Sequence, residues 1–450
     1  MNRLAHDLPL ANHHYPSQDL TSVFDTPRPN KAADSDSAFH SWYSFVLSFP
    51  PHLVRHYLRE FSLTPGSVIL DPFCGTGTTL VETRLNGQSS VGIEANPFAH
   101  FASSVKIDWS VTPDELTTAA RTVAEKALKL LHAQGIDDLA PGGGSVPHAA
   151  LRRLDPEAER LLIDNSISPL PLHKALVLLD AIEEMRHRAY HSHALLAFAD
   201  ALVYSYSNLR FGPEVGIGKP KIDTPVIQPW LDRVHRICRD IASLHRDDFP
   251  TSSAHFADAR EPSSVLPPHS VDAVITSPPY PNEKDYTRTT RLESVILGFV
   301  SSREELRDFK KTLIRSNTRG VYKQDNDDRW VADNPDIEAL ADAIEKRRIE
   351  LGKTSGFERL YPRVTRLYFG GMARHLADLR NCLRPGANLA YVVGDQASYL
   401  RVMIPTGRLI ADIASSLGYQ VLRVDLFRSR FSTATRTHLR EEVVLLRWSP

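Results

Sequence analysis

The chain is poor in cysteine and lacks any cysteine pattern that would hold a metal cluster. Only three occur among 450 residues, Cys74, Cys238 and Cys382, and they form no C-x-x-C pair. This spacing excludes a zinc-finger cluster and a disulfide framework, and it is typical of a protein from a reducing cytoplasm. We therefore expect no metal site and a cytoplasmic location.

Long apolar runs and a strong charge bias are also missing. No apolar stretch approaches the ~18 residues of a membrane-spanning helix, and the N-terminus lacks a signal-peptide core. The net charge is −1, with 42% hydrophobic and 24% charged residues, which is ordinary for a soluble globule and excludes a generally basic DNA coat. We expect no membrane contact, and about two units, or one domain with large insertions.

Two nucleotide-binding patterns are absent, and a shorter glycine turn is present instead. Residues 68–85 read VILDPFCGTGTTLVETRL, which predicts a buried strand, a turn at Gly75 and Gly77, and a helix. Glycine lets the backbone approach a ligand closely, and a helix N-terminus offers free N–H groups. The NAD-binding pattern G-x-G-x-x-G needs a third glycine, which is missing here, and this argues against NAD. The missing G-x-x-x-x-G-K-[ST] element argues against a nucleoside triphosphate.

A carboxylate follows this turn at an informative spacing. The strand predicted over 89–94 ends in Glu94. That acid lies about twenty residues after the first glycine, where dinucleotide-binding folds place the carboxylate that binds ribose hydroxyls. A ribose-containing ligand is therefore expected beside the glycine turn.

The most distinctive segment is Thr-Ser-Pro-Pro-Tyr at 276–280, which ends the apolar run VDAVI. Two prolines fix two φ angles and remove two backbone donors, so the turn is stiff and its carbonyls have no partner within it. Ser277 adds a hydroxyl and Tyr280 adds a flat ring. Acceptors in one plane beside an aromatic face suit a planar amine, and a nucleobase with an exocyclic amine has this form.

DPFCGTGT followed later by SPPY resembles the S-adenosyl-L-methionine-dependent DNA amino-methyltransferases, which methylate cytosine at N4 or adenine at N6. The Ser form of the tetrapeptide is the commoner cytosine-N4 form. Residues 40–54 are similar to the family's segment before the glycine turn, and the resemblance covers roughly residues 40–106 and 250–450. It implies S-adenosylmethionine as cofactor, double-stranded DNA as substrate, and a cognate restriction endonuclease or defence-system subunits as partners.

The resemblance implies roles for the SPPY residues. The Ser277 hydroxyl and the Pro278 carbonyl, in a turn stiffened by Pro279, would hold the target amine with its lone pair turned out of the ring plane. Tyr280 would stack on a base flipped out of the duplex, a contact worth on the order of 1–3 kcal/mol. Most of the catalysis would then be positioning.

It also implies a set of cofactor-binding residues. Glu94 would accept both ribose hydroxyls, and Asp258, at the end of the strand expected over 252–257, would accept the adenine amino group. Helix capping is the other interpretation of Asp258. The remaining cofactor residues expected are Asp71, Phe73, Gly75, Gly77, Thr78 and Asn96.

Alternating strands and helices predict an α/β fold: a doubly wound, mostly parallel, seven-stranded sheet with an antiparallel edge strand, as in S-adenosylmethionine-dependent methyltransferases. The edge is antiparallel because no helix separates the last two strands. We expect strands over 67–71, 89–94, 252–257, 271–276, 387–393, 420–427 and 442–448. Helices are expected over 51–61, 78–86, 228–247, 361–383 and 405–417.

Two helical insertions interrupt this alternation. A flexible arm is expected over 1–39, and the methyltransferase core over 40–109 and 228–450. The insertions are expected over 110–227 and 301–358, and either can carry target recognition or, for the first, a lid. Positive charge for DNA is local: residues 428–440 contain no acid. The DNA-binding residues expected are Arg428, Arg430, Arg436, Arg210 and Lys219.

Three other functions stay open. The Ser form of the tetrapeptide does not exclude adenine N6 as the target. An RNA guanine-N2 methyltransferase has a related tetrapeptide, although one that usually begins with Asn. A module that binds S-adenosylmethionine and DNA without methylating is disfavoured by the intact Ser277 and Tyr280.

Overall fold

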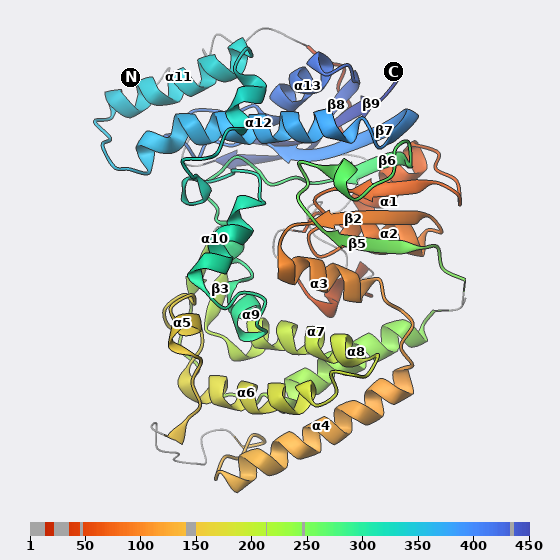
Figure 1. Ribbon diagram of the computed structural model, residues 1–450, viewed down its shortest axis with the longest axis vertical. Helices are drawn as coiled ribbons and strands as arrows, with labels where there is room; N and C mark the ends of the chain where they lie inside the picture. Colours follow the sequence, from red (N-terminus) through yellow and green to blue (C-terminus); the bar gives the residue numbers. More distant parts are fainter. Residues whose placement is uncertain are drawn as a thin grey trace.

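Figure 1 shows the computed structural model of the protein, which describes residues 14–21, 36–45, 48–140, 150–212, 214–244, 248–432 and 436–450. Most of the arm expected over 1–39 lies outside these ranges. A strand-rich part occupies the upper half of the view, and a group of long helices occupies the lower half (Figure 1).

The sheet has seven strands in the order β5-β2-β1-β6-β7-β9-β8. All neighbours are parallel except those of β9, which runs antiparallel to both β7 and β8. The expected mostly parallel sheet with an antiparallel edge is thereby confirmed. Its strands are β1 (Val68–Asp71), β2 (Ser89–Glu94), β5 (Ser252–Phe256), β6 (Val271–Thr276), β7 (Leu383–Gly394), β8 (Gln420–Ser432) and β9 (Thr437–Arg447).

Apolar residues cover both faces of the sheet because helices pack on both sides. Successive side chains of a strand point to opposite faces, so Leu70 lies in the cluster with α12 (Tyr361–Leu379) and α13 (Thr406–Ser416). Ile69 lies in the cluster with α1 (Pro51–Glu60). The connecting helices α2 (Thr78–Leu85) and α3 (Pro97–Lys106) contact β2.

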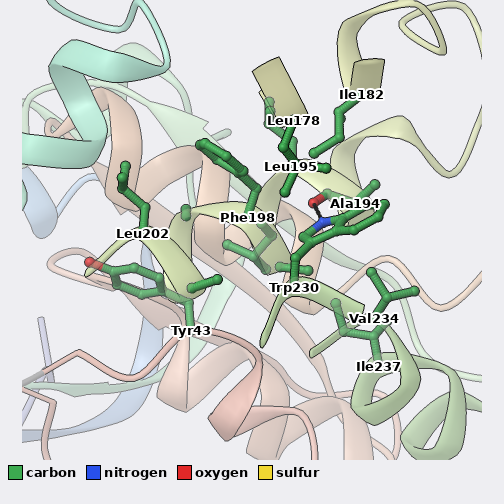
Figure 2. Packing of buried hydrophobic residues seen from close by; sticks show 14 of the residues in the cluster. Tyr43, Leu178, Ile182, Ala194, Leu195, Phe198, Leu202, Trp230, Val234 and Ile237 are labelled. Atoms are coloured by element: carbon green, nitrogen blue, oxygen red, sulfur yellow. Dashed lines mark hydrogen bonds between the residues drawn. The ribbon is translucent and has the colours of Figure 1, made fainter. Parts of the chain in front are cut away.

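The first insertion is a helical layer that shares a hydrophobic core with the sheet's helices. Figure 2 shows its centre, where the Trp230 indole donates to the Ala194 carbonyl at 3.0 Å. Phe198 packs in the same cluster as Tyr43 and Phe98, so the hydrophobic core of the layer is continuous with that of α3. Its elements are α4 (Pro113–Ala133), α5 (Pro156–Glu159), α6 (Pro169–Glu183), α7 (His191–Ala201), the π-turn η4 (Leu202–Tyr206) and the hairpin β3 (Leu209–Phe211) with β4 (Val215–Ile217). The helix α8 (Ile227–Ala242), which follows the insertion in the chain, packs against α4 and α7.

The second insertion packs against α12, one of the helices that cover the sheet. Gly370 in α12 permits this packing, because a Cβ there would meet the Asp327 carbonyl oxygen at 2.0 Å. The long helix α11 packs along α12 (Figure 1). Its elements, with the turns before it, are η5 (Pro262–Ser264), η6 (Tyr286–Arg288), α9 (Arg291–Ile296), α10 (Arg303–Lys311), η7 (Thr318–Gly320), η8 (Asp327–Val331), α11 (Pro335–Glu350) and η9 (Glu358–Leu360).

Candidate active site

The two sequence motifs meet because β1 and β6 are parallel neighbours. Leu70 pairs with Val274, so the glycine turn and the SPPY turn leave the same edge of the sheet. Both turns line one cavity of about 380 Å³. The motif residues on its wall are Phe73, Cys74, Gly75, Thr76, Thr78, Glu94, Asn96, Asp258, Ser277, Pro278, Pro279 and Tyr280.

Asp71 joins the two turns and does not line the cavity. Its carboxylate is fully buried and accepts 2.6 Å hydrogen bonds from the hydroxyls of Thr276 and Thr79. Burial raises the pKa of Asp71 to about 6, against the opposing effect of these hydrogen bonds. The direct cofactor contact that the resemblance implied for Asp71 therefore has no support in the structure, which gives this side chain a positioning role.

The two glycines of the turn face different neighbours. Gly75 has φ +52° and no atom within 4 Å of an added Cβ, so its open side adjoins the cavity. Gly77 has φ +88° and lies at the start of α2, where a Cβ would meet the Ser103 Cβ of α3 at 3.1 Å. Gly77 is absent from the cavity wall, so its expected approach to a ligand is replaced by close helix packing.

Glu94 is fixed at the cavity by backbone N–H groups. Its two carboxylate oxygens accept from Gly75 at 2.8 Å and from Asn96 at 2.7 Å. Burial raises the pKa of Glu94 to about 7. Asn96 in turn caps α3, accepting from Phe98 and Ala99, and donates to the Thr290 hydroxyl at 3.0 Å. Each oxygen of Glu94 keeps lone pairs for hydroxyl donors in the cavity.

Phe73 contributes a ring to the cavity wall and meets His375 edge-on at 5.0 Å between centroids. His375 is fully buried between the Ala259 carbonyl and the Tyr391 hydroxyl. Burial lowers the pKa of His375 to about 4, so this ring is neutral at physiological pH. The Phe73 ring is therefore supported by the His375 imidazole of α12, whose two nitrogens are both hydrogen-bonded.

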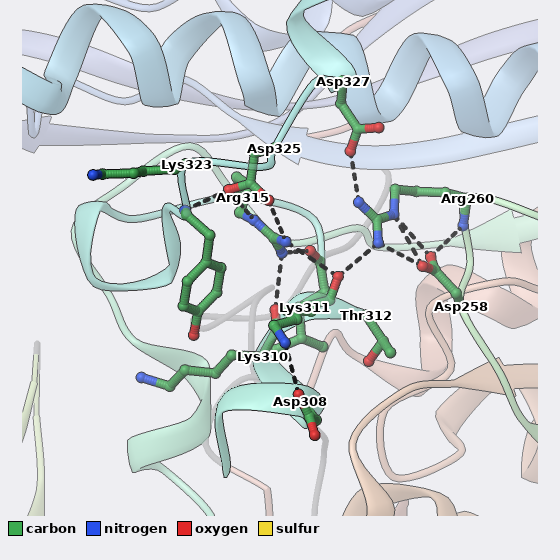
Figure 3. Close-up of polar contacts among 12 residues, drawn as sticks. Asp258, Arg260, Asp308, Lys310, Lys311, Thr312, Arg315, Lys323, Asp325 and Asp327 are labelled. Carbon is green, nitrogen blue, oxygen red and sulfur yellow. Dashed lines mark hydrogen bonds and ion pairs between the residues drawn. The ribbon is translucent and has the colours of Figure 1, made fainter. Parts of the chain in front are cut away.

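Asp258 lines the cavity but its carboxylate already has a partner. Figure 3 shows the Arg260 guanidinium lying across it, with Arg260 Nε 3.0 Å from Asp258 Oδ1. Arg260 also bonds Asp327 at 2.6 Å and the Lys311 carbonyl at 2.8 Å. Asp258 is not a helix cap, because the N-cap position of the following 3-10 helix is Glu261. It remains a cavity residue whose orientation is set by Arg260.

The second insertion supplies a cavity wall that sequence motifs did not indicate. Residues Thr312 to Asn317 line the cavity together with the two motif turns. Arg315 fixes this segment through Asp325, with bonds of 2.9 and 2.8 Å, and through the carbonyls of Lys310 and Lys311 (Figure 3). Only a run of charged residues signalled this region in the sequence, and such runs are usually solvated.

The SPPY turn is held by its neighbours in β7 and η6. The Ser277 hydroxyl donates to the Val392 carbonyl at 3.2 Å and also contacts the Tyr280 hydroxyl, and a hydroxyl oxygen with two lone pairs can still accept a further hydrogen bond. The Tyr280 backbone N–H donates to the Tyr286 hydroxyl at 3.0 Å. Tyr286 also lines the cavity, and the sequence reasoning missed it. Burial raises the pKa of both tyrosines, so both are neutral.

The expected DNA-binding arginines divide into two groups. Arg428 lines the cavity and forms an ion pair with Glu441, the residue just after the acid-free run, so it is not a free phosphate ligand. Arg430 and Arg436 are exposed, and their side chains form no ion pair with the described residues. The tip of this hairpin, residues 433–435, lies outside the described ranges.

Arg210 and Lys219 are exposed on the β3–β4 hairpin of the first insertion. This hairpin and the loop after SPPY line a second, smaller groove, formed by Phe211, Gly212, Glu214, Val215, Glu283, Lys284, Asp285, Arg288, Thr289 and Arg319. Lys284 lines both the groove and the cavity. Burial and the nearby Arg430 lower the pKa of Lys284, while Glu214 opposes this. Both hairpins therefore lie near the cavity.

Within the described ranges, no three His, Cys, Asp or Glu side chains gather in a way that would hold a metal ion. The same ranges contain no helix that is both long and apolar enough to cross a membrane.

Known proteins resemble the chain along most of its length. A family profile described as DNA methylase matches residues 11–103, which contain the glycine turn and Glu94. The type II methyltransferase M.BsoBI of Geobacillus stearothermophilus is 26% identical over 443 residues, covering 91% of this chain and 84% of its own. M.AvaI of Anabaena variabilis is 23% identical over 422 residues, covering 87% and 81%.

A third type II methyltransferase, M.MjaII of Methanocaldococcus jannaschii, is 39% identical over 69 residues, which are 15% of this chain and 13% of its own. The longer matches extend far beyond the glycine turn that many cofactor-binding folds share. They reach across the SPPY turn and both insertions, and together with the family profile they support an amino-methyltransferase family (N4/N6) for this chain.

Proposed function

We propose that the protein transfers a methyl group from S-adenosylmethionine to the exocyclic amine of a base flipped out of double-stranded DNA, with cytosine N4 as the preferred target. One observation carries the proposal: the glycine turn with Glu94 and the SPPY turn line the same cavity. A cofactor site alone would need only the first turn. A methyl donor and an amine acceptor need both within one enclosed space.

The chain's own residues suit the cofactor at the glycine-turn end. Gly75 leaves open space where a ligand can approach the backbone, and the fixed Glu94 carboxylate can accept two ribose hydroxyls. Thr78 lies at the N-terminus of α2, where free N–H groups suit the carboxylate of the methionine half. Asp258, which lines the cavity, is the acceptor proposed for the adenine amino group. S-adenosylmethionine, when bound, supplies a methyl group on a positively charged sulfur.

The residues at the SPPY end hold the amine. An exocyclic amine is a poor nucleophile because its lone pair is delocalised into the ring, so the enzyme gains most by holding the two N–H bonds. The Ser277 oxygen is the first acceptor, because its own proton is donated to the Val392 carbonyl. The Pro278 carbonyl is the second acceptor, and Tyr280, supported by Tyr286, supplies the stacking face. Pro279 stiffens the turn between them.

The domain organisation follows from which parts reach this cavity. We propose residues 40–109 and 228–450 as the methyltransferase core. Within it, residues 301–358 build a pocket wall through Arg315 and Arg260. The first insertion, residues 110–227, is then the unit that reads the DNA, because its β3–β4 hairpin lies beside the cavity's second groove. A restriction endonuclease of the same specificity is the partner that the type II relatives favour.

One experiment tests the function and the target base. The protein is incubated with S-adenosylmethionine labelled in its methyl group and with mixed-sequence DNA, and the DNA is then digested to nucleosides and separated. We expect labelled N4-methylcytosine. Labelled N6-methyladenine alone would change the proposed target base and keep the reaction. No label in the DNA, or label only in RNA offered in a parallel incubation, would reject the proposed function. Tyr280→Ala is the matched inactive control.

A further inference from the structure

An ion pair stands at the cavity wall beside the SPPY turn. Arg428 of β8 and Glu441 of β9 are opposite each other in the strand register, and both line the cavity. Arg428 Nε lies 2.9 Å from Glu441 Oε2, and Arg428 Nη2 contacts Glu441 Oε1. The remaining nitrogen, Nη1, makes no hydrogen bond to the described residues. The guanidinium is thus fixed in orientation with donors left over.

This pair is adjacent to the ring that would stack on the base. A Cβ built on Gly394 would meet Tyr280 Cε2 at 3.0 Å and Glu441 Cγ at 3.3 Å, so Tyr280 and Glu441 flank the same glycine. Burial is the main cause of the raised pKa of the Tyr280 hydroxyl, and both charges of the pair also act on it: Glu441 raises the pKa further and Arg428 lowers it. A register shift between Leu426 and Arg428 bends β8 at this point, and Phe427 and Arg428 both reach the cavity.

The chemistry of the two target bases differs where such a donor would act. With the amine innermost at Ser277, the ring position two atoms from the amine-bearing carbon lies at the other end of the base's Watson–Crick edge. In cytosine this position carries the O2 oxygen, a hydrogen-bond acceptor. In adenine the equivalent position is a C2–H group, which accepts nothing. An arginine N–H at this edge therefore pairs with cytosine and remains unpaired beside adenine.

We propose that Arg428, oriented by Glu441, selects cytosine by donating to its O2 atom. The inference rests on the proposed function and deepens it, since it names the residue that decides between the two bases of the family. This role distinguishes Arg428 from Arg430 and Arg436 on the same hairpin. Those two arginines have no ion-pair partner within the described residues, whereas Arg428 is paired with Glu441. A positive charge alone does not suffice for this selection, because a lysine at position 428 would lack the planar guanidinium that Glu441 orients.

The test compares kcat/KM on two duplexes that differ only at the methylated position. One carries cytosine there and the other adenine, both in the target sequence found by mapping. We expect Arg428→Gln and Arg428→Lys each to lower the cytosine-to-adenine ratio by about ten-fold or more, the cost of one missing hydrogen bond in a desolvated site. The matched control is Arg423→Gln, an arginine of the same strand that is likewise paired to carboxylates, Asp425 and Glu60, and does not line the cavity.

Arg428→Lys also separates base selection from phosphate binding. It keeps the positive charge, so the dependence of DNA affinity on salt should match that of the wild type while the base ratio falls. An unchanged ratio in this variant would overturn the inference even if Arg428→Gln fails to fold. A wild-type enzyme that methylates only adenine would overturn it and leave methyl transfer intact, and one that methylates neither base would reject the proposed function itself.

Discussion

The Thr276 hydroxyl donates a 2.6 Å hydrogen bond to the buried carboxylate of Asp71, and this bond joins the two motifs of the active site across 205 positions of sequence. Thr276 immediately precedes Ser277, and Asp71 begins the glycine turn. The pairing of β1 with β6 brings the amine acceptor and the cofactor turn together, and this buried contact, supported by Thr79 from α2, fixes the two strand ends to each other.

Removing that bond should cost both stability and activity. We expect Thr276→Val to lower the free energy of unfolding by ~1–3 kcal/mol, because it leaves a buried carboxylate with one hydroxyl donor fewer. Methyl transfer should fall as well, because Ser277 moves with Thr276. Denaturant unfolding and single-turnover rates measure the two effects. Thr122→Val, an exposed threonine of α4, is the control and should change neither. Wild-type rates in Thr276→Val would contradict the positioning role.

The two glycines of the turn should respond differently to alanine. Gly75→Ala places a methyl group in open space beside the cavity, at a left-handed φ that costs ~1 kcal/mol. We therefore expect a larger loss of binding free energy for S-adenosylhomocysteine than of the free energy of unfolding. Gly77→Ala forces a contact with Ser103 and should mainly lower stability. Calorimetric binding and urea unfolding of both variants check this. Equal losses of affinity would show that Gly77 also faces the ligand.

Cofactor affinity should rise with pH through about 7. Burial raises the pKa of Glu94 to about 7, so its carboxyl is largely protonated below that pH and cannot accept two hydroxyl donors. The effect on folding has the opposite sign. Because the pKa of Glu94 is higher in the native state than in the unfolded chain, its contribution to the free energy of unfolding is lost as the pH rises from the unfolded pKa to about 7. Binding of S-adenosylhomocysteine from pH 6 to 8 measures the first effect. Glu94→Gln should flatten the profile, and an unaltered profile in that variant would assign the titration to another group.

Tyr280 should matter for its ring and Tyr286 for its hydroxyl. Tyr280→Ala should reduce turnover strongly while cofactor affinity stays near wild type, and Tyr280→Phe should keep most activity. Tyr286→Phe removes the acceptor of the Tyr280 backbone N–H, so it should lower kcat more than it raises KM. Steady-state kinetics measure kcat and KM, and calorimetry measures cofactor affinity in the same variants. Full turnover in Tyr280→Ala would leave the SPPY turn as a mere strand end. In Tyr286→Phe, full turnover would mean that its bond is dispensable.

DNA affinity should depend on the exposed arginines of the β8–β9 hairpin. Arg430→Ala with Arg436→Ala should weaken DNA binding and flatten the slope of log K against log salt, by about one unit for each phosphate that the variant no longer binds. Arg423→Ala on the same strand is the control, because the Arg423 guanidinium is already paired with the carboxylates of Glu60 and Asp425. An unaltered slope in the double variant would place the phosphate-binding residues elsewhere, with the β3–β4 hairpin as the next candidate.

The extent of the last two strands shows one limit of sequence pattern. Strands were expected over 420–427 and 442–448, and the structure extends them to Ser432 and back to Thr437. The extra residues are rich in Arg, Ser and Thr and carry no apolar alternation. They pair because the hairpin continues its own register, Arg430 opposite Leu439 and Phe431 opposite His438. Cross-strand pairing, which decides this, leaves no mark in either segment alone.

The sequence by itself determined the fold class, the seven strands and the two turns that carry the chemistry, because each follows from local properties. Apolar runs make buried strands, glycines permit left-handed turns, and paired prolines stiffen a strand end. Most of the residues expected at the site, from Phe73 to Tyr280, do lie on its wall. These properties need no knowledge of what lies across the sheet.

Only the tertiary structure decided which charged and polar groups were already used. It buried Asp71 beneath the cavity between two threonines, aimed Gly77 at Ser103 and paired Arg428 with Glu441. It also brought Tyr286 and the Thr312–Asn317 wall to the site. A side chain's partner is set by chain segments far away in sequence, and whether a charge faces a ligand or a neighbour depends on that partner. No local pattern in these residues records it.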